Sequence, residues 1–145
     1  MTISVIMAGR SGHIHTATVG ESVASVAARL AQERIGALPV IDKSDSGAIV
    51  GIFSERDVIY GLANMGADIL NKTVGEVMTA PAISVTSDTP ILSALSLMTR
   101  RRIRHLPVVD NGALIGFVSI GDLVKHRIEK IEGEAAAMRD YIATA

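Results

Sequence analysis

Two short motifs place an aspartate three residues after a serine, and each follows an apolar segment that contains a glycine. The first is Ser54–Asp57 after Gly51, and the second is Ser119–Asp122 after Gly116. If a helix begins at each serine, the unpaired backbone N–H groups of its first turn form a position where phosphate binds readily. The carboxylate only accepts hydrogen bonds, so it suits the two donors of a vicinal diol. The motifs are therefore candidates for binding a phosphorylated sugar.

The same spacing is also that of a capping box, in which both side chains only satisfy the helix end. Two observations favour ligand binding over capping alone. The motif recurs in both halves of the chain, and Gly51 and Gly116 would let a ligand approach the strand backbone closely.

Positive charge is distributed unequally around the two motifs. Arg56 lies between the serine and the aspartate of the first motif, where the second has Gly121. The second half has its own cations, namely Arg102, Arg104, His105 and Lys125. We expect the phosphate of one ligand to reach cations of the other half, and the two sites to differ in ligand or affinity.

Other chemistries find little support in the sequence. The basic run 100–105 fits the end of a helix, where cations complement the dipole, and the net charge of −1 argues against nucleic-acid binding.

His13 and His15 share a strand face but lack a third ligand, so we expect no metal. No nucleophile with a base, phosphate-binding Walker loop or dinucleotide fingerprint is present, so we expect a protein without catalytic residues.

The amino-acid composition excludes or disfavours several further kinds of protein. The absence of cysteine excludes disulfides and thiolate chemistry, and 3% aromatic residues argue against base stacking. No apolar run approaches the roughly 18 residues of a membrane helix, and the first ten residues lack the basic region of a secretory signal. We therefore expect a cytoplasmic protein with no membrane contact. A hydrophobic fraction of 48% and a mean hydropathy of +0.38 are high for a small chain, which predicts a homodimer.

An internal repeat positions the motifs. Ile35–Asp42 recurs as Ile103–Asp110, and each is followed by its glycine and its Ser-x-x-Asp motif. The second copy is shorter between its two strands, where Asn111-Gly112 predicts a two-residue hairpin. Two copies that differ in one loop indicate a duplication.

Each copy is predicted to fold as strand, helix, strand, strand, helix. In the first copy, Val23, Val26 and Leu30 share a helix face, and Gly36 is expected to end that helix. The predicted strands are 38–41, 49–53, 106–109 and 114–119, and further helices are expected from Ser54 and from Pro90. The expected fold is α/β (α+β), with the sheets packed about a pseudo-twofold axis and two related clefts between the copies.

The predicted units are residues 1–64 for the first repeat with the N-terminal segment, 65–82 for a linker, 83–128 for the second repeat and 129–145 for a C-terminal helix extension. The last helix is expected to run from Asp122 to the end of the chain. A heptad-like apolar seam lies along it, formed by Val124, Ile128, Ile131, Ala135, Met138 and Ile142. We expect this seam to pack on a partner subunit, with folding back onto its own chain as the alternative.

The repeated strand with Leu-Pro-Val and the repeated Gly-x-x-Ser-x-x-Asp motif resemble a tandem cystathionine-β-synthase-type (CBS) domain pair, or Bateman module. The resemblance covers about residues 3–128. It implies that Asp57 and Asp122 accept hydrogen bonds from ribose hydroxyls, and that Ser54 and Ser119 face phosphate. It also implies that adenine lies against the Leu-Pro strand and the first strand of the same copy. The residues in question are Thr16, Thr18, Ala37, Leu38 and Pro39, and Ser84, Thr86, Leu106 and Pro107.

The resemblance to stand-alone bacterial members implies a non-catalytic sensor that binds AMP, NAD(H) or both, with ATP as a further possibility. Such a sensor would transmit its ligand state to a regulated protein through a rearrangement of repeats or subunits. The alternative is a constitutive assembly module whose clefts are vestigial.

Overall fold

The computed structural model describes residues 1–10 and 12–145, and its first half is built around a three-stranded sheet. The elements are β1 (Ala17–Thr18), α2 (Val23–Glu33), β2 (Ala37–Asp42), the 3-10 turn η1 (Lys43–Asp45), β3 (Ala48–Ser54) and α3 (Glu55–Met65). β1 runs parallel to β2, which pairs antiparallel with β3. η2 (Gly66–Asn71) and α4 (Val74–Val77) then lead to the second half.

The second half repeats this order. Its elements are α5 (Ile91–Arg101), β4 (His105–Asp110), β5 (Ala113–Ser119) and α6 (Ile120–Thr144). In place of β1 it has a single parallel bridge between Val85 and Val108. The predicted order of elements is confirmed, with the first strand of the second copy reduced to that bridge.

The two antiparallel ladders share an irregularity. The register shifts between Val40 and Ile41 in one and between Val108 and Val109 in the other, which are equivalent positions of the repeat. The Asn111-Gly112 hairpin is confirmed, because both residues have positive φ (52° and 78°), as this two-residue turn requires. The duplication is therefore visible in backbone detail as well as in element order.

The residue that ends each first helix differs from the prediction. Gly36 was expected to end the first helix, but α2 ends at Glu33 and Arg34 adopts the left-handed conformation with φ 55°. Arg102 does the same after α5, with φ 53°. The prediction was wrong because Arg34, two residues earlier, adopts the left-handed conformation that ends the helix. Gly36 instead lies close to another side chain. A Cβ at Gly36 would lie only 3.2 Å from Oε1 of Glu55.

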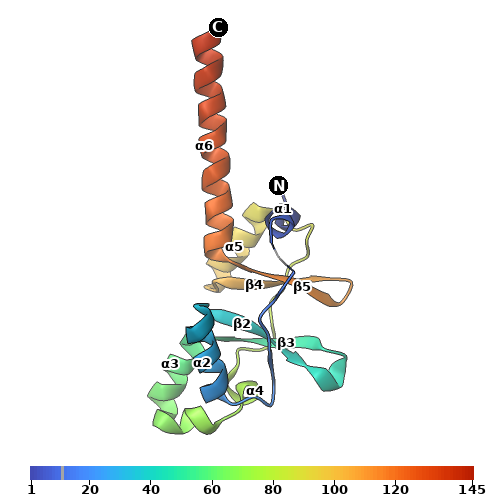
Figure 1. The fold of residues 1–145 in the computed structure, drawn as a ribbon, viewed down its shortest axis with the longest axis vertical. Coiled ribbons are helices and arrows are strands. Elements are labelled where there is room, and N and C mark those ends of the chain that lie inside the picture. The colour runs from blue at the N-terminus through green and yellow to red at the C-terminus, as the bar shows by residue number, and fades with distance from the viewer. Residues whose placement is uncertain (11) are drawn as a thin grey trace.

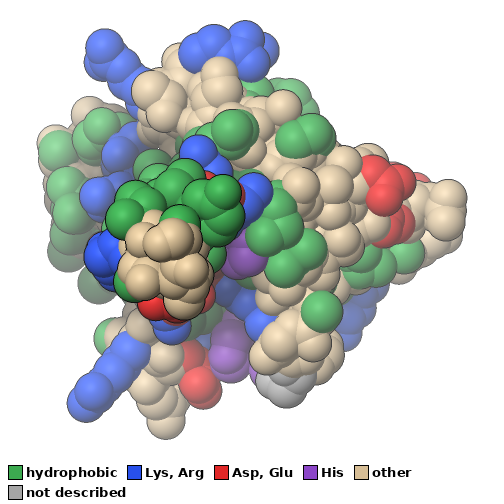
Figure 2. Space-filling view, turned by 90° about the horizontal axis from the view of Figure 1, so that it is seen from above, with side chains coloured by type: hydrophobic (Ala, Val, Ile, Leu, Met, Phe, Trp, Pro, Cys, Tyr) green, Lys and Arg blue, Asp and Glu red, His purple; other side chains and the backbone are tan. Residues whose placement is uncertain are grey.

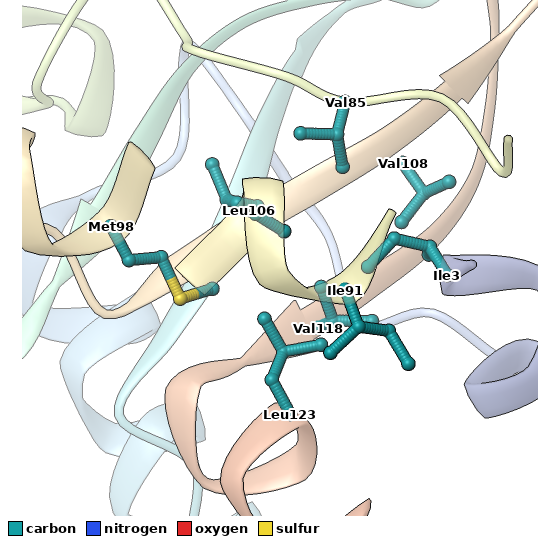
Figure 3. Close-up of a cluster of buried hydrophobic side chains, with 9 residues drawn as sticks. Ile3, Val85, Ile91, Met98, Leu106, Val108, Val118 and Leu123 are labelled. Carbon is teal, nitrogen blue, oxygen red and sulfur yellow. The ribbon is translucent and has the colours of Figure 1, made fainter. Parts of the chain in front are cut away.

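Each half has its own apolar core. The first is centred on Leu38, Val40 and Phe53, all fully buried. The second includes Leu106 and Leu123 and is shown in Figure 3. The repeated Leu of the Leu-Pro strand thus anchors both cores, which explains why it recurs.

The N-terminal helix α1 (Ile3–Ala8) packs with the second half. Ile3 is fully buried in the second core, and its backbone N–H donates to the carbonyl of Thr89 at 2.9 Å. The predicted unit 1–64 grouped this segment with the first repeat by chain order. In packing terms, α1 belongs to the second repeat, and the chain crosses between the halves before β1.

The two sheets lie side by side at the centre of the molecule, with β3 in contact with β5 (Figure 1). The helices α2, α3 and α4 lie on one side of this pair, and α1, α5 and α6 lie on the other (Figure 1). The predicted mixed α/β architecture of two packed repeats is confirmed. α6 runs for 25 residues and projects beyond the body of the molecule. None of the helices in the described residues is long and apolar enough to cross a membrane.

Candidate functional site

Both Ser-x-x-Asp motifs form capping boxes. In the second, the backbone N–H of Ser119 donates to Oδ2 of Asp122 at 2.7 Å, and the N–H of Asp122 donates to Oγ of Ser119 at 3.2 Å. In the first, Oδ2 of Asp57 accepts from the backbone N–H of Ser54 at 2.8 Å. The capping function is therefore present in both copies, and the surroundings decide what else each carboxylate can do.

The carboxylates of the two motifs have different surroundings. Oδ1 of Asp57 accepts a hydrogen bond from the hydroxyl of Thr79 at 2.9 Å. Asp122 instead forms an ion pair with Arg10, whose Nη2 lies 2.5 Å from Oδ2. Asp122 also lines a cavity of about 500 Å³.

This inter-repeat cavity takes its lining from three parts of the chain. The N-terminal segment contributes Met7, Arg10, Gly12, His13, Ile14 and His15; the end of α2 and the start of β2 contribute Arg34, Ile35, Gly36 and Ala37; and the second repeat contributes His105, Ile115, Gly116, Phe117, Ser119 and Asp122. The cavity therefore belongs to neither copy alone. The cavity exists only because the two repeats pack together.

Four of the predicted site residues line this cavity, namely Ala37, His105, Ser119 and Asp122. The two Leu-Pro pairs are buried in their strands, and both leucines belong to the apolar cores. Among the threonines, Thr16 accepts a hydrogen bond from Arg29 through its carbonyl, and Thr18 donates through its N–H to Glu21. Thr86 is held by Thr89.

The predicted cations are placed mostly outside the cavity. Arg56 reaches from the first repeat to the second, where its Nη1 donates to the backbone carbonyl of Arg102 at 3.3 Å. Arg104 and Lys125 have exposed side chains and, like Ser54, Asp57 and Ser84, are not among the lining residues. Arg56 therefore links the two halves through a backbone carbonyl. That the phosphate of one ligand reaches cations of the other half stays a prediction.

Among the residues of the candidate site, Arg10 is the main one that the sequence analysis did not identify. Besides the ion pair with Asp122, its Nη1 donates to the carbonyl of Phe117 at 2.9 Å. Arg10 lies far from the second Ser-x-x-Asp motif in the sequence and is not part of any recognisable motif. The only signal was a lone arginine just after a short apolar helix, which is too common to indicate a site.

Three histidines and Phe117 also line the cavity. The rings of His105 and Phe117 are stacked, with centroids 5.5 Å apart and planes 8° apart. His13 and His15 meet edge to face at 4.8 Å. Within the described residues no group of His, Cys, Asp and Glu could hold a metal ion. His13, His15 and His105 present imidazole rings to the cavity.

The cavity lining combines a neutral imidazole, an ionised carboxylate and two guanidinium groups. Burial lowers the pKa of His105, and the neighbouring Arg104 lowers it further, against the opposing effects of Asp122 and Glu55. Burial would raise the pKa of Asp122, but the N–H of Ser119 and the Arg10 guanidinium outweigh it and keep the pKa below its usual value. Asp122 is thus ionised at neutral pH, with the cations Arg10 and Arg34 in the same lining.

Comparison with known proteins accounts for this architecture. The model of the CBS domain matches residues 10–64 and 74–129. This chain belongs to the CBS domain family. A CBS-domain protein of Agrobacterium tumefaciens, ATU1752, has a similar structure, with a TM-score of 0.81 and 32% identity over 87% of this chain and 92% of that one.

Two further relatives are informative. The structure of CBSX2 in complex with AMP has a TM-score of 0.72 and 30% identity over 88% of this chain and 96% of that one. The mitochondrial protein CBSX3 of Arabidopsis thaliana is 35% identical over 86% of this chain and 62% of its own length. The chain spans 61% and 56% of two other curated relatives. The resemblance to a CBS domain pair is confirmed.

Proposed function

We propose that this CBS pair is a non-catalytic regulatory module that binds an adenine nucleotide in the inter-repeat cavity. The observation that carries the proposal is the position of Asp122. This ionised carboxylate stands at the N-terminal end of α6 and lines a cavity of about 500 Å³, which lies within the range of small-molecule sites. The CBSX2 structure with AMP supports the choice of ligand class.

The lining residues suit the three parts of such a ligand. The Asp122 carboxylate accepts hydrogen bonds from the ribose hydroxyls. Arg10 and Arg34 supply charge for phosphate, together with the positive end of the α6 dipole. The apolar side chains of Ile14, Ile35 and Ile115 offer a surface for the flat base. AMP is the proposed ligand. Binding of NAD(H) or ATP stays a prediction.

We further propose that each chain has one principal site. Asp57 already accepts a hydrogen bond from Thr79, and Arg56 is held by the carbonyl of Arg102. Neither side chain is among the residues that line the inter-repeat cavity, and each would have to share or give up its present contact to hold a second ligand. The sequence predicted that the two sites differ in ligand or affinity. We accordingly propose that each chain binds about one nucleotide.

The regulatory part of the proposal rests on where the ligand would bind. A nucleotide in this cavity would contact both repeats and the first turn of α6. It can shift their arrangement only by as much as it binds one arrangement more tightly than another. A regulated protein would then recognise the shifted arrangement.

The test combines a thermal-shift screen with calorimetry on the purified chain. AMP, ADP, ATP, NAD, NADH, GMP and S-adenosylmethionine are compared. A ligand at 100 times its Kd stabilises the fold by about 2.7 kcal/mol, which is a shift of several degrees. We expect a shift with AMP and none with GMP, and about one AMP bound per chain.

Asp122→Asn is the decisive variant, because it keeps a side chain that can cap α6 but removes the charge. Loss of a charge-assisted contact should raise the Kd for AMP by about ten- to a hundred-fold. Asp57→Asn, at the equivalent position of the other repeat, should leave it unchanged. If no nucleotide binds to protein freed of copurified ligand, the proposal is wrong and the constitutive assembly module is the better explanation.

A further inference from the structure

The outer part of α6 has little contact with the rest of its own chain. Leu123, near the start of the helix, is fully buried in the second core. Beyond it the helix leaves the body and projects as an isolated rod (Figure 1). In proteins, most of the stability of a helix comes from the packing of an amphipathic face rather than from intrinsic helix propensity. The alternative that the seam folds back onto its own chain is wrong, because the rod points away from it.

The apolar seam along this rod remains open. Its large members are between 41% and 67% exposed, namely Val124, Ile128, Ile131, Met138 and Ile142. Seen end-on in Figure 2, hydrophobic side chains gather along one side of the rod. With Ala135, the seam residues alternate in steps of four and three, which is the spacing of a two-stranded coiled coil.

We propose that the occupant of this seam is the α6 helix of a second copy of this chain, paired in parallel and in register. In heptad terms Ile128, Ala135 and Ile142 take the a positions, and Val124, Ile131 and Met138 take the d positions. The seam alone permits more than one orientation. The charged residues that flank it distinguish them.

Parallel pairing brings opposite charges together on both sides of the seam. Arg127 at a g position faces Glu132 of the partner subunit at the following e position, and Glu134 likewise faces Arg139 of the partner subunit. The twofold axis doubles each pair. Four complementary pairs therefore flank an apolar stripe of six layers.

Antiparallel pairing brings like charges together instead. An antiparallel alignment centred on Gly133 would align the same seam. It would place Glu132 opposite Glu132 of the partner subunit, and Lys125 opposite Arg139 of the partner subunit. Like charges across a helix pair are unfavourable and select against a wrong arrangement. Charge complementarity thus chooses the parallel orientation.

The outer positions of the helix agree with this assignment. Gly133 falls at an f position, on the side away from the seam, and no atom of the described residues would lie within 4 Å of a Cβ at this position. Glu129, Lys130 and Asp140 also fall at outer positions. A helix-weakening glycine and these charges are thus kept out of the proposed interface.

Parallel pairing also has a consequence for the nucleotide site, and this consequence alone rests on the proposed function. α6 begins beside Ser119 and Asp122, so the two cavities of a dimer would lie at the same end of the rod. A change at either cavity would then act on the base of one shared coiled coil. An antiparallel rod would place the cavities at opposite ends.

Single cysteines give a direct test, because the natural chain has none. In a parallel, in-register pair each seam residue faces its own copy, so Val124→Cys and Ile131→Cys should each form a disulfide-linked dimer under mild oxidation. Glu129→Cys, on the outer side, should remain largely uncrosslinked. The proposal is overturned if the unmodified chain is monomeric by light scattering at tens of micromolar concentration. It is also overturned if Val124→Cys crosslinks only when mixed with Ile142→Cys.

A charge swap tests the orientation independently. Glu132→Arg and Arg127→Glu should each weaken the dimer several-fold, because each places like charges together. The double variant R127E/E132R should restore it in the parallel arrangement. In the antiparallel arrangement the two copies of position 132 would still face each other with like charges, so a lack of restoration would contradict the proposal. Glu129→Arg is the matched control and should change nothing. AMP binding measured on the same variants separates this proposal from the proposed function.

Discussion

The guanidinium of Arg10 lies 2.5 Å from the carboxylate of Asp122, so the chain supplies its own cation to the residue proposed to hold a ribose. The same guanidinium donates to the carbonyl of Phe117 at 2.9 Å. Asp122 also accepts from Ser119 through the oxygen that faces Arg10. A ribose must therefore share this carboxylate with Arg10 or displace it.

Removing Arg10 should tighten the binding of a ligand that has no phosphate. In Arg10→Ala, the Asp122 carboxylate keeps its bond from Ser119 but loses the competing guanidinium, and a partly exposed ion pair contributes about 0.2–1 kcal/mol. We therefore expect adenosine to bind up to about five-fold more tightly, measured by calorimetry. The gain should be smaller for AMP, because Arg10 also supplies positive charge for its phosphate.

Arg29→Ala is the matched control for this experiment. Arg29 forms an ion pair with Glu21 and donates to the carbonyl of Thr16, outside the cavity. Its removal should leave the affinity for adenosine unchanged. Weaker adenosine binding by Arg10→Ala would instead show that Arg10 is itself part of the nucleoside site.

The stability of the fold should fall as the pH drops below about 6.5, and His105 should be one cause. Burial lowers the pKa of His105 in the folded chain, so the unfolded chain, with an ordinary histidine pKa of about 6.5, binds more protons in this range. Stability therefore rises with pH through this window and is lost on acidification. His105→Gln should flatten the dependence of Tm on pH between about 7.5 and 5.5.

His13→Gln serves as the control, because His13 is an exposed histidine of the same cavity lining. It should leave the slope of the natural chain intact. An equal slope in His105→Gln and the natural chain would remove His105 as the cause. Measurements in buffers of equal ionic strength keep salt effects on the nearby arginines constant.

The equivalent glycines Gly51 and Gly116 should tolerate alanine unequally. A Cβ at Gly51 would lie 2.8 Å from the carbonyl oxygen of Thr79, which exchanges two backbone hydrogen bonds with Ile52. A Cβ at Gly116 would meet the end of the flexible Met7 side chain at 2.0 Å. Overpacking against fixed backbone costs about 1–3 kcal/mol. Gly51→Ala should lose about that much in urea denaturation, and Gly116→Ala should lose less.

The Gly116→Ala variant also has a second expected effect. Met7 lines the inter-repeat cavity, so its displacement should change the Kd for AMP even where stability is nearly kept. Gly51 is not among the lining residues, and Gly51→Ala should leave the Kd unchanged in the folded protein. A larger loss of stability for Gly116→Ala than for Gly51→Ala would contradict this account.

Much of the fold was predictable because its signals are local. The recurrence of the Leu-Pro strand and the Ser-x-x-Asp motif is visible without knowledge of any contact. So is the start of a helix at Ser54 and Ser119, because a serine followed by an aspartate at this spacing closes a capping box within one turn. The residue that ends the first helix was not predicted correctly. Arginine is not a residue type typical of positive φ, so the sequence pointed to the nearby Gly36 instead.

The candidate site was predictable only in part, and the difference lies between Asp57 and Asp122. The two residues stand in equivalent motifs, and sequence patterns treat them alike. Only packing placed a threonine against Asp57 and a cavity against Asp122. Tertiary contacts of this kind depend on which segments the fold brings together, and no periodicity encodes them.

The sequence by itself determined the duplication, the order of elements, the helix-starting motifs and the heptad seam of α6. These follow from side-chain periodicity and capping, which act over a few residues. The tertiary structure alone decided that α1 packs on the second core, that Arg10 meets Asp122, and that the seam stays open. Each of these depends on which segments distant in the chain come into contact. Those contacts follow from the burial of apolar surface across the whole fold.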